Sequence, residues 1–230
     1  MTRRRTPESQ TDSDTNKMTP VNDTRIEGWR TAALAYLREN LRERAPAQLG
    51  KHHVFEESPL EGEGPVALFE FSLASGSATP ERFFVATGQT EPNYYAALEL
   101  VPEDMYALHL GTRFMLVLGV GLAADTDRSR INLDKAVRDL VWSIRPGELV
   151  SGIEWAAAFD VDGQLHGVTR CRIGQQPAYA FVGDAPPGFS TQVDIAPQIA
   201  YRIHLGRALL AEMDRNSDEA DEAQAPLEDS

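Results

Sequence analysis

The sequence predicts an α+β fold in which one unit, a helix, three antiparallel strands and a closing helix, occurs twice with pseudo-twofold symmetry. Three observations predict this internal duplication. The decapeptide PEDMYALHLG at 102–111 recurs as PQIAYRIHLG at 197–206. Helix-type and strand-type hydrophobic patterns follow one another in the same order in both halves. Each closing helix begins with a proline, which suits the first helical position.

The repeat extends beyond the decapeptide. Residues 84–116 align with residues 179–211 without a gap, and turn residues and aromatics stay in step. Seven positions are identical, namely Gly88/Gly183, Pro92/Pro187, Pro102/Pro197, Tyr106/Tyr201, His109/His204, Leu110/Leu205 and Gly111/Gly206.

The first half opens with a predicted helix from about residue 23 to 44. Asp23 is the expected N-cap and Pro46 ends the helix. Apolar residues recur along it at helical spacing. We expect strands at 53–57, 66–74 and 81–87, and a closing helix that starts at Pro102.

The second half repeats this order. A helix is predicted over 133–145, with Asn132 as its N-cap and Pro146 as its stop. Strands are expected at 152–160, 164–173 and 178–182, with a tight hairpin turn at Asp162-Gly163. The two meanders are expected either to share one six-stranded sheet or to form two layers. The predicted divisions are 1–22, a disordered N-terminal tail; 23–124, the first half; 125–130, a connection; 131–213, the second half; and 214–230, a disordered acidic tail.

Composition limits the classes of function. The net charge is -13, with +1 over residues 1–22 and -7 over residues 212–230, so the body between them is also acidic. An acidic body disfavours nucleic-acid and membrane-surface binding. No apolar run approaches the roughly 18 residues of a membrane span, and the arginines near the start precede no apolar stretch. With a single cysteine, we expect a soluble, cytoplasmic, bacterial-type protein, translated from Met1 or Met18.

The repeated motif is the first candidate site. On a helix, Tyr106, His109 and Arg113 share one stripe, and His204 occupies the matching position in the second half. These groups suggest an anion-binding or acid–base site, or hydrogen-bonded core residues. Arg113 is expected to pair with Asp104, Glu99 or an anionic ligand.

The glycines of the motif carry a structural prediction. A glycine inside a helix costs about 1 kcal/mol relative to alanine, so two at equivalent places need a reason. We expect Gly111 and Gly206 to lie at close helix contacts, where the two closing helices cross.

The loop at 88–95 is the second candidate site. Tyr94 and Tyr95 suit either a recognition surface or packing beneath the loop. Two histidines without cysteines or an acidic triad predict no metal site, and the absence of nucleotide-binding and nucleophile-elbow motifs predicts no cofactor. Cys171 is expected to be buried and inert.

The order of elements resembles that of small bacterial secretion chaperones, which implies binding of a protein partner. We therefore hypothesise a non-enzymatic protein-binding, adaptor or chaperone-like module, either a monomer or a homodimer. The alternative is a small-ligand-binding protein or an enzyme with a pocket near Tyr106, His109, Arg113 and His204.

Overall fold

The computed structural model describes residues 21–60, 62, 64–73, 82–88, 92–96, 100–123 and 128–224. It has the predicted α+β class, with helices packed on two antiparallel sheets. The helices are α1 (Asp23–Leu41), the short 3-10 helix η1 (Arg42–Arg44), α2 (Pro102–Leu118), α4 (Leu133–Ile144) and α5 (Pro197–Gln224).

The two sheets are separate, so the two-layer expectation is the one the structure follows. The first sheet has the order β1-β2-β3-β4 and the second the order β5-β6-β7-β8-β9. Each meander of three predicted strands gains a strand after it, and the second also gains β5 on its other edge. The strands are β1 (His52–Phe55), β2 (Val66–Ser72), β3 (Arg82–Thr87), β4 (Asn93–Ala96), β5 (Gly121–Leu122), β6 (Val150–Val161), β7 (Gln164–Ile173), β8 (Gln176–Gly183) and β9 (Gly188–Ser190).

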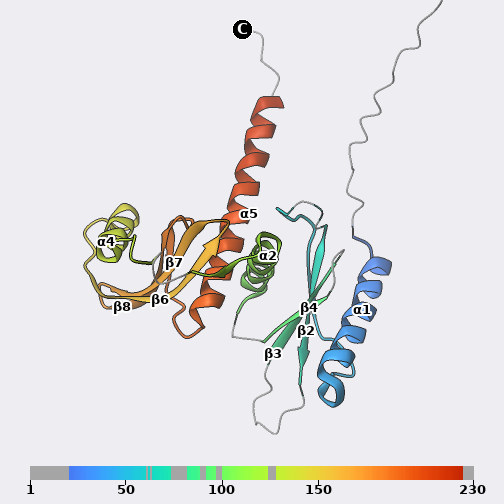
Figure 1. The fold of residues 1–230 in the computed structure, drawn as a ribbon. Helices are drawn as coiled ribbons and strands as arrows, with labels where there is room; N and C mark the ends of the chain where they lie inside the picture. Colours follow the sequence, from blue (N-terminus) through green and yellow to red (C-terminus); the bar gives the residue numbers. More distant parts are fainter. Residues whose placement is uncertain are drawn as a thin grey trace, which may run out of the picture.

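The elements form successive layers (Figure 1). Helix α1 covers the outer face of the first sheet and α4 the outer face of the second, while α2 and α5 cross between the sheets. The largest hydrophobic cluster is central and combines α2 and α5 with the inner faces of both sheets. The repeated helices are therefore the shared core of the molecule.

Local signals set most of the element boundaries. Asn132 caps α4 as predicted, because its side chain accepts a hydrogen bond from the Lys135 amide at 3.1 Å. The cap of α1 is Asn22 rather than Asp23, since Asn22 accepts from the Arg25 amide at 3.0 Å. The predicted hairpin turn at Asp162-Gly163 joins β6 to β7, and both of its residues have positive φ.

Helix α5 is longer than predicted. The disordered acidic tail was expected from residue 214, but the helix continues to Gln224. Alanine, glutamate, arginine and glutamine are good helix formers, and no glycine or proline interrupts the stretch after Gly206. The end of α5 projects beyond the sheets (Figure 1). The expected N-terminal tail up to residue 20, and residues 225–230, lie outside the described part of the chain.

The crossing of α2 and α5 depends on the two repeated glycines. A methyl group at Gly111 would overlap the carbonyl oxygen of Arg202 and lie 2.7 Å from its carbonyl carbon. A methyl group at Gly206 would overlap the carbonyl oxygen of Ala107 in the same way, 2.6 Å from its carbon. Backbone meets backbone at both places, so the predicted close helix contacts are confirmed.

Candidate functional site

The two repeated tyrosines connect the crossing helices to different sheets. Tyr106 is buried, stacks on Phe55 of β1 at 4.1 Å between ring centroids, and donates a hydrogen bond to the carbonyl of Glu57 at 2.5 Å. Tyr201 stacks on Phe159 of β6 at 4.6 Å. Its hydroxyl lies 2.6 Å from Nδ1 of His166, which is also buried.

Of the two repeated histidines, His109 is buried and His204 is partly buried. His109 is 1% exposed, and burial, reinforced by the nearby Arg113 charge, lowers its pKa to about 4. His204 donates from Nε2 to the carbonyl of Pro186 at 2.7 Å, and its ring stacks on Phe181 of β8 at 3.9 Å. Burial lowers the pKa of His204 as well. Tyr106 thus packs on the first sheet and His204 on the second.

The acidic partner expected for Arg113 binds another arginine. Asp104 is buried in the first turn of α2 and receives Nε and Nη2 of Arg207 from α5, at 3.1 and 2.5 Å. Gln192 donates to the other carboxylate oxygen of Asp104 at 3.4 Å. Arg207 follows Gly206 at the crossing, so its side chain reaches α2. Glu99, the other expected partner, lies outside the described residues.

The 88–95 segment contains a strand that was expected to be a loop. Tyr94 and Tyr95 belong to β4 and pair through their backbones with Val85 and Phe84 of β3. The side chains of both tyrosines lie outside what the structure describes. Cys171 is 1% exposed, as predicted, and burial raises the pKa of its thiol to about 11.

Removing the two tyrosine hydroxyls is expected to have unequal effects on stability. Tyr106→Phe loses one hydrogen bond, and we expect a loss of about 1 kcal/mol in the free energy of unfolding. Tyr201→Phe also leaves buried Nδ1 of His166 without its partner, and we expect about 2 kcal/mol. Urea denaturation of both variants measures the difference, and each serves as the control for the other because both rings are stacked. An equal loss, or a smaller loss for Tyr201→Phe, would contradict this account.

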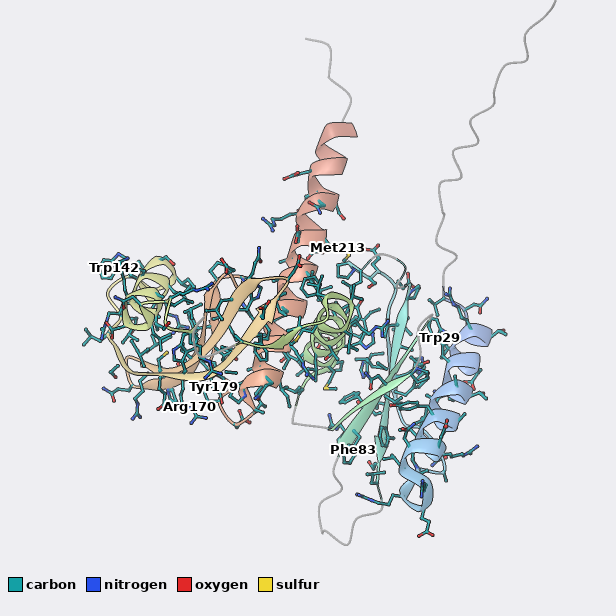
Figure 2. The ribbon with its side chains drawn as sticks, viewed as in Figure 1. Trp29, Phe83, Trp142, Arg170, Tyr179 and Met213 are labelled. Carbon is teal, nitrogen blue, oxygen red and sulfur yellow. The ribbon has the colours of Figure 1, made fainter. Side chains whose placement is uncertain are left out.

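An apolar groove lies between the first sheet and α5, a site that the sequence analysis did not identify. It has a volume of about 430 Å³, and Val54, Phe55, Tyr106, Leu210 and Met213 supply its apolar surface. Figure 2 labels Met213 on α5, above its crossing with α2. A second hollow of about 570 Å³ shares Met213 and continues along α5 past Leu209 and the Ser58-Pro59 turn.

The rim of this groove is acidic. Glu56 and Glu57 follow β1, and Glu103 lies in the first turn of α2. All three side chains are exposed to solvent. An apolar floor with three carboxylates around it suits an apolar segment that carries positive charges.

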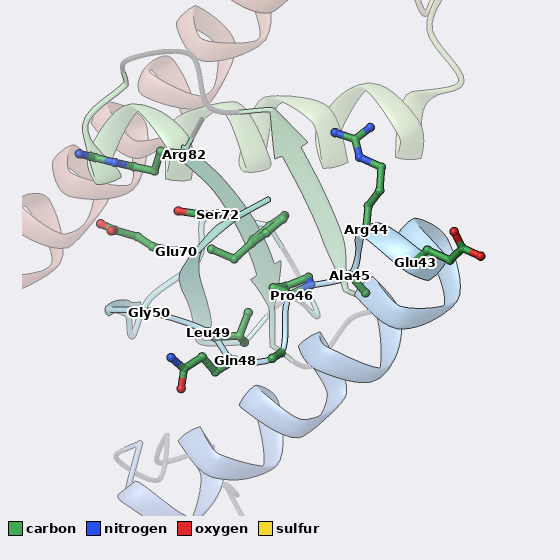
Figure 3. A pocket seen from close by; sticks show the side chains of 12 residues that line it. Glu43, Arg44, Ala45, Pro46, Gln48, Leu49, Gly50, Glu70, Ser72 and Arg82 are labelled. Carbon is green, nitrogen blue, oxygen red and sulfur yellow. The ribbon is translucent and has the colours of Figure 1, made fainter. Parts of the chain in front are cut away.

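A larger pocket of about 640 Å³ lies at the other end of the first sheet (Figure 3). The segment 43–50 forms one wall, and Glu70, Ser72 and Arg82 lie on the strands opposite. Glu43 lies at one end of the pocket, whereas Arg82 and Glu70 lie at the other end (Figure 3). Its charged groups do not converge on one point, as a catalytic or small-ligand site would require.

The described residues contain neither a membrane-spanning helix nor a metal-binding cluster. None of their helices is both long enough and apolar enough to cross a membrane. Within the same residues, no three His, Cys, Asp or Glu side chains are grouped so that they would hold a metal ion.

The structure brings together only part of the predicted site. Tyr106 lines the groove, whereas the three pockets described above include neither His109, Arg113 nor His204 among their lining residues. The sequence did not predict the groove, because Leu210 and Met213 lie near the predicted end of the second half. The signal available was the adjacent pair Glu56-Glu57 at the end of a predicted strand.

Comparison with known proteins gives no relative from which to infer function. No family model matches the chain, and neither a curated protein nor a solved structure matches it.

Proposed function

We propose that this protein is a non-enzymatic protein-binding module, an adaptor or chaperone, that holds an apolar, positively charged segment of a partner in the groove between β1 and α5. The observation that carries the proposal is the chemistry of the groove. Apolar side chains from β1, α2 and α5 line one side of it, and Glu56, Glu57 and Glu103 stand exposed at its rim.

The proposal includes an internal duplication of the chain, which the strand registers support. Thr87 pairs with Ala67, and Ala67 pairs with Val54. Val182, the counterpart of Thr87 in the gapless alignment, pairs with Gly167, which pairs with Ala158. Val54 is thus equivalent to Ala158.

Side-chain contacts support the same equivalence. The residues after Val54 and Ala158 are Phe55 and Phe159, which stack on the repeated tyrosines at interplanar angles of 10° and 11°. The close contacts at Gly111 and Gly206 are made with Arg202 and Ala107, which are themselves aligned. These reciprocal contacts are those expected of two copies related by a twofold axis.

The arrangement of the repeated histidines favours a binding module over an enzyme. A catalytic or ligand site near Tyr106, His109, Arg113 and His204 requires these groups to converge on one accessible pocket. His109 is 1% exposed, and His204 uses Nε2 in a hydrogen bond to Pro186 on the side of the second sheet. Their contacts are those of residues that hold the crossing helices in place.

Charge reversal at the rim is expected to weaken binding to the groove. The probe is the fluorescein-labelled peptide Lys-Val-Gly-Leu-Ala-Ala-Lys, and its affinity is measured by fluorescence anisotropy. We expect Glu56→Lys combined with Glu57→Lys to weaken it at least tenfold, because the attraction between the rim and the lysines of the peptide becomes repulsion. We expect added salt to weaken binding to the parent protein.

Glu43→Lys is the control, since it makes the same kind of substitution, with half the change of charge, at an exposed site on the other pocket. It should change affinity less than twofold. The proposal is wrong if the peptide does not bind, or if the Glu43 and rim variants weaken binding equally.

A further inference from the structure

We propose that the partner segment binds as an extended strand, added antiparallel to the free edge of β1, as β5 is added to β6. This inference rests on the proposed function and specifies how the groove is used. It also specifies the chemistry of the partner, an extended peptide with an apolar residue opposite Phe55 and basic residues near the glutamates of the rim.

The two sheets differ at one edge. In the second sheet, β5 pairs with the outer edge of β6, with Gly121 opposite Asp160 and Leu122 opposite Phe159. In the first sheet, β1 is equivalent to β6, yet among the described strands it is the last in its sheet. An edge strand presents backbone N–H and C=O groups that can pair with another chain.

The backbone of β1 is oriented for such pairing. The amide of Glu70 donates to the carbonyl of Lys51 at 2.8 Å, so Lys51 directs its backbone toward β2. Successive residues of a strand point their backbone groups to alternate sides, so Val54 and Glu56 direct theirs to the free edge. The equivalent of Val54 in the second sheet does the same, because the carbonyl of Ala158 accepts from the amide of Ala123 at 3.1 Å.

The path of the chain explains why β5 covers the edge of β6, whereas no described strand covers the edge of β1. Helix α2 ends at Leu118, Gly119 adopts a left-handed conformation, and the chain turns directly into β5. At the corresponding place α5 continues as a helix to Gln224. Leu210 and Met213, which line the groove, align with Met115 and Leu118 at the end of α2. The groove is therefore the counterpart of the place that β5 fills.

The peptide Lys-Val-Gly-Leu-Ala-Ala-Lys tests this strand geometry because its centre copies residues 120–124. Its first alanine corresponds to Ala123, whose amide donates to the neighbouring strand. N-methylation of that alanine removes the donor, and we expect affinity to fall roughly fivefold to tenfold. N-methylation of the leucine adds the same methyl group where the amide points away from the edge, and we expect a change of less than twofold.

Amide hydrogen exchange on the full-length protein is the second measurement. Bound peptide should slow exchange at Val54 and Glu56, whose amides face the edge, and leave Phe55, whose amide faces β2, unchanged.

The outcomes separate this inference from the proposed function. If the peptide binds and rim charge reversal weakens it, but the two N-methylated peptides bind equally well, strand addition is wrong and the groove function stands. The same conclusion follows if a hydrocarbon-stapled helical peptide of the same composition binds more tightly. If the unmodified peptide does not bind, both proposals fail. If the chain forms a dimer in which the amides of Val54 and Glu56 are already protected from exchange without peptide, a second copy occupies the edge and strand addition of a partner is wrong.

Discussion

Replacing Gly111 with alanine is expected to lower the free energy of unfolding by about 3 kcal/mol or more. The added methyl group would overlap the carbonyl oxygen of Arg202, a backbone atom that no rotamer change can move. Relief requires α2 and α5 to separate, and these helices form the centre of the largest hydrophobic cluster. The gain of about 1 kcal/mol from better helix propensity does not offset this loss. Gly206→Ala should behave alike, because its methyl group would overlap the carbonyl of Ala107.

Gly28→Ala is the matched control for both variants. Gly28 is also within a helix, and a methyl group there would meet no atom within 4 Å. It should stabilise the protein by up to about 1 kcal/mol, since only the propensity effect remains. Urea denaturation of the three variants gives the comparison. Our account of the crossing is contradicted if Gly111→Ala and Gly28→Ala shift stability in the same direction.

Acid is expected to destabilise the fold through His109. In the folded protein its pKa is lowered to about 4, whereas the ordinary value of 6.5 applies in the unfolded chain. Between these values the unfolded chain binds a proton that the folded protein does not, so stability falls as the pH drops. The contribution of His109 to the free energy of unfolding is constant above about pH 6.5. It is lost progressively as the pH falls toward 4, by about 3 kcal/mol in total. Free energies of unfolding from urea titrations across this range measure the loss.

His109→Gln is the variant that isolates this effect. Glutamine keeps polar hydrogen-bonding groups at the site but does not titrate, so the curve of stability against pH should flatten between pH 6.5 and 4. Burial also lowers the pKa values of His166 and His204, so part of the dependence of stability on pH should remain in this variant. A variant curve parallel to that of the parent protein would show that His109 is not the group responsible.

The sequence predicted most of the fold because its signals are local. Asn132, Pro102 and Pro197 set helix starts through backbone rules that act within one turn, and each start is confirmed. The glycine pair was also predictable, since an unfavourable residue at two equivalent helix positions implies a close contact. At the second candidate site the predicted loop contains the strand β4. This strand is short, and its formation depends on pairing with β3.

The groove was not predictable because it depends on long-range packing. Val54, Glu103 and Met213 come from three distant parts of the chain, and only the crossing of α2 and α5 brings them together. The same limit applies to Asp104, whose partner Arg207 is reached across the crossing rather than along one helix. Periodicity indicates on which face of a helix a residue lies, but not which element covers that face.

Strand β5 has a consequence for stoichiometry. A twofold dimer of identical chains would present two equal strand edges and bind two ligands, with the opportunity for homotropic cooperativity. In this chain β5 pairs with the edge of β6. If the two halves are copies as proposed, β5 permanently occupies one of the two equivalent strand edges. Under the proposed strand addition, a titration should therefore saturate at one peptide per chain and follow a simple hyperbola, because β5 would take the place of a ligand in the second half.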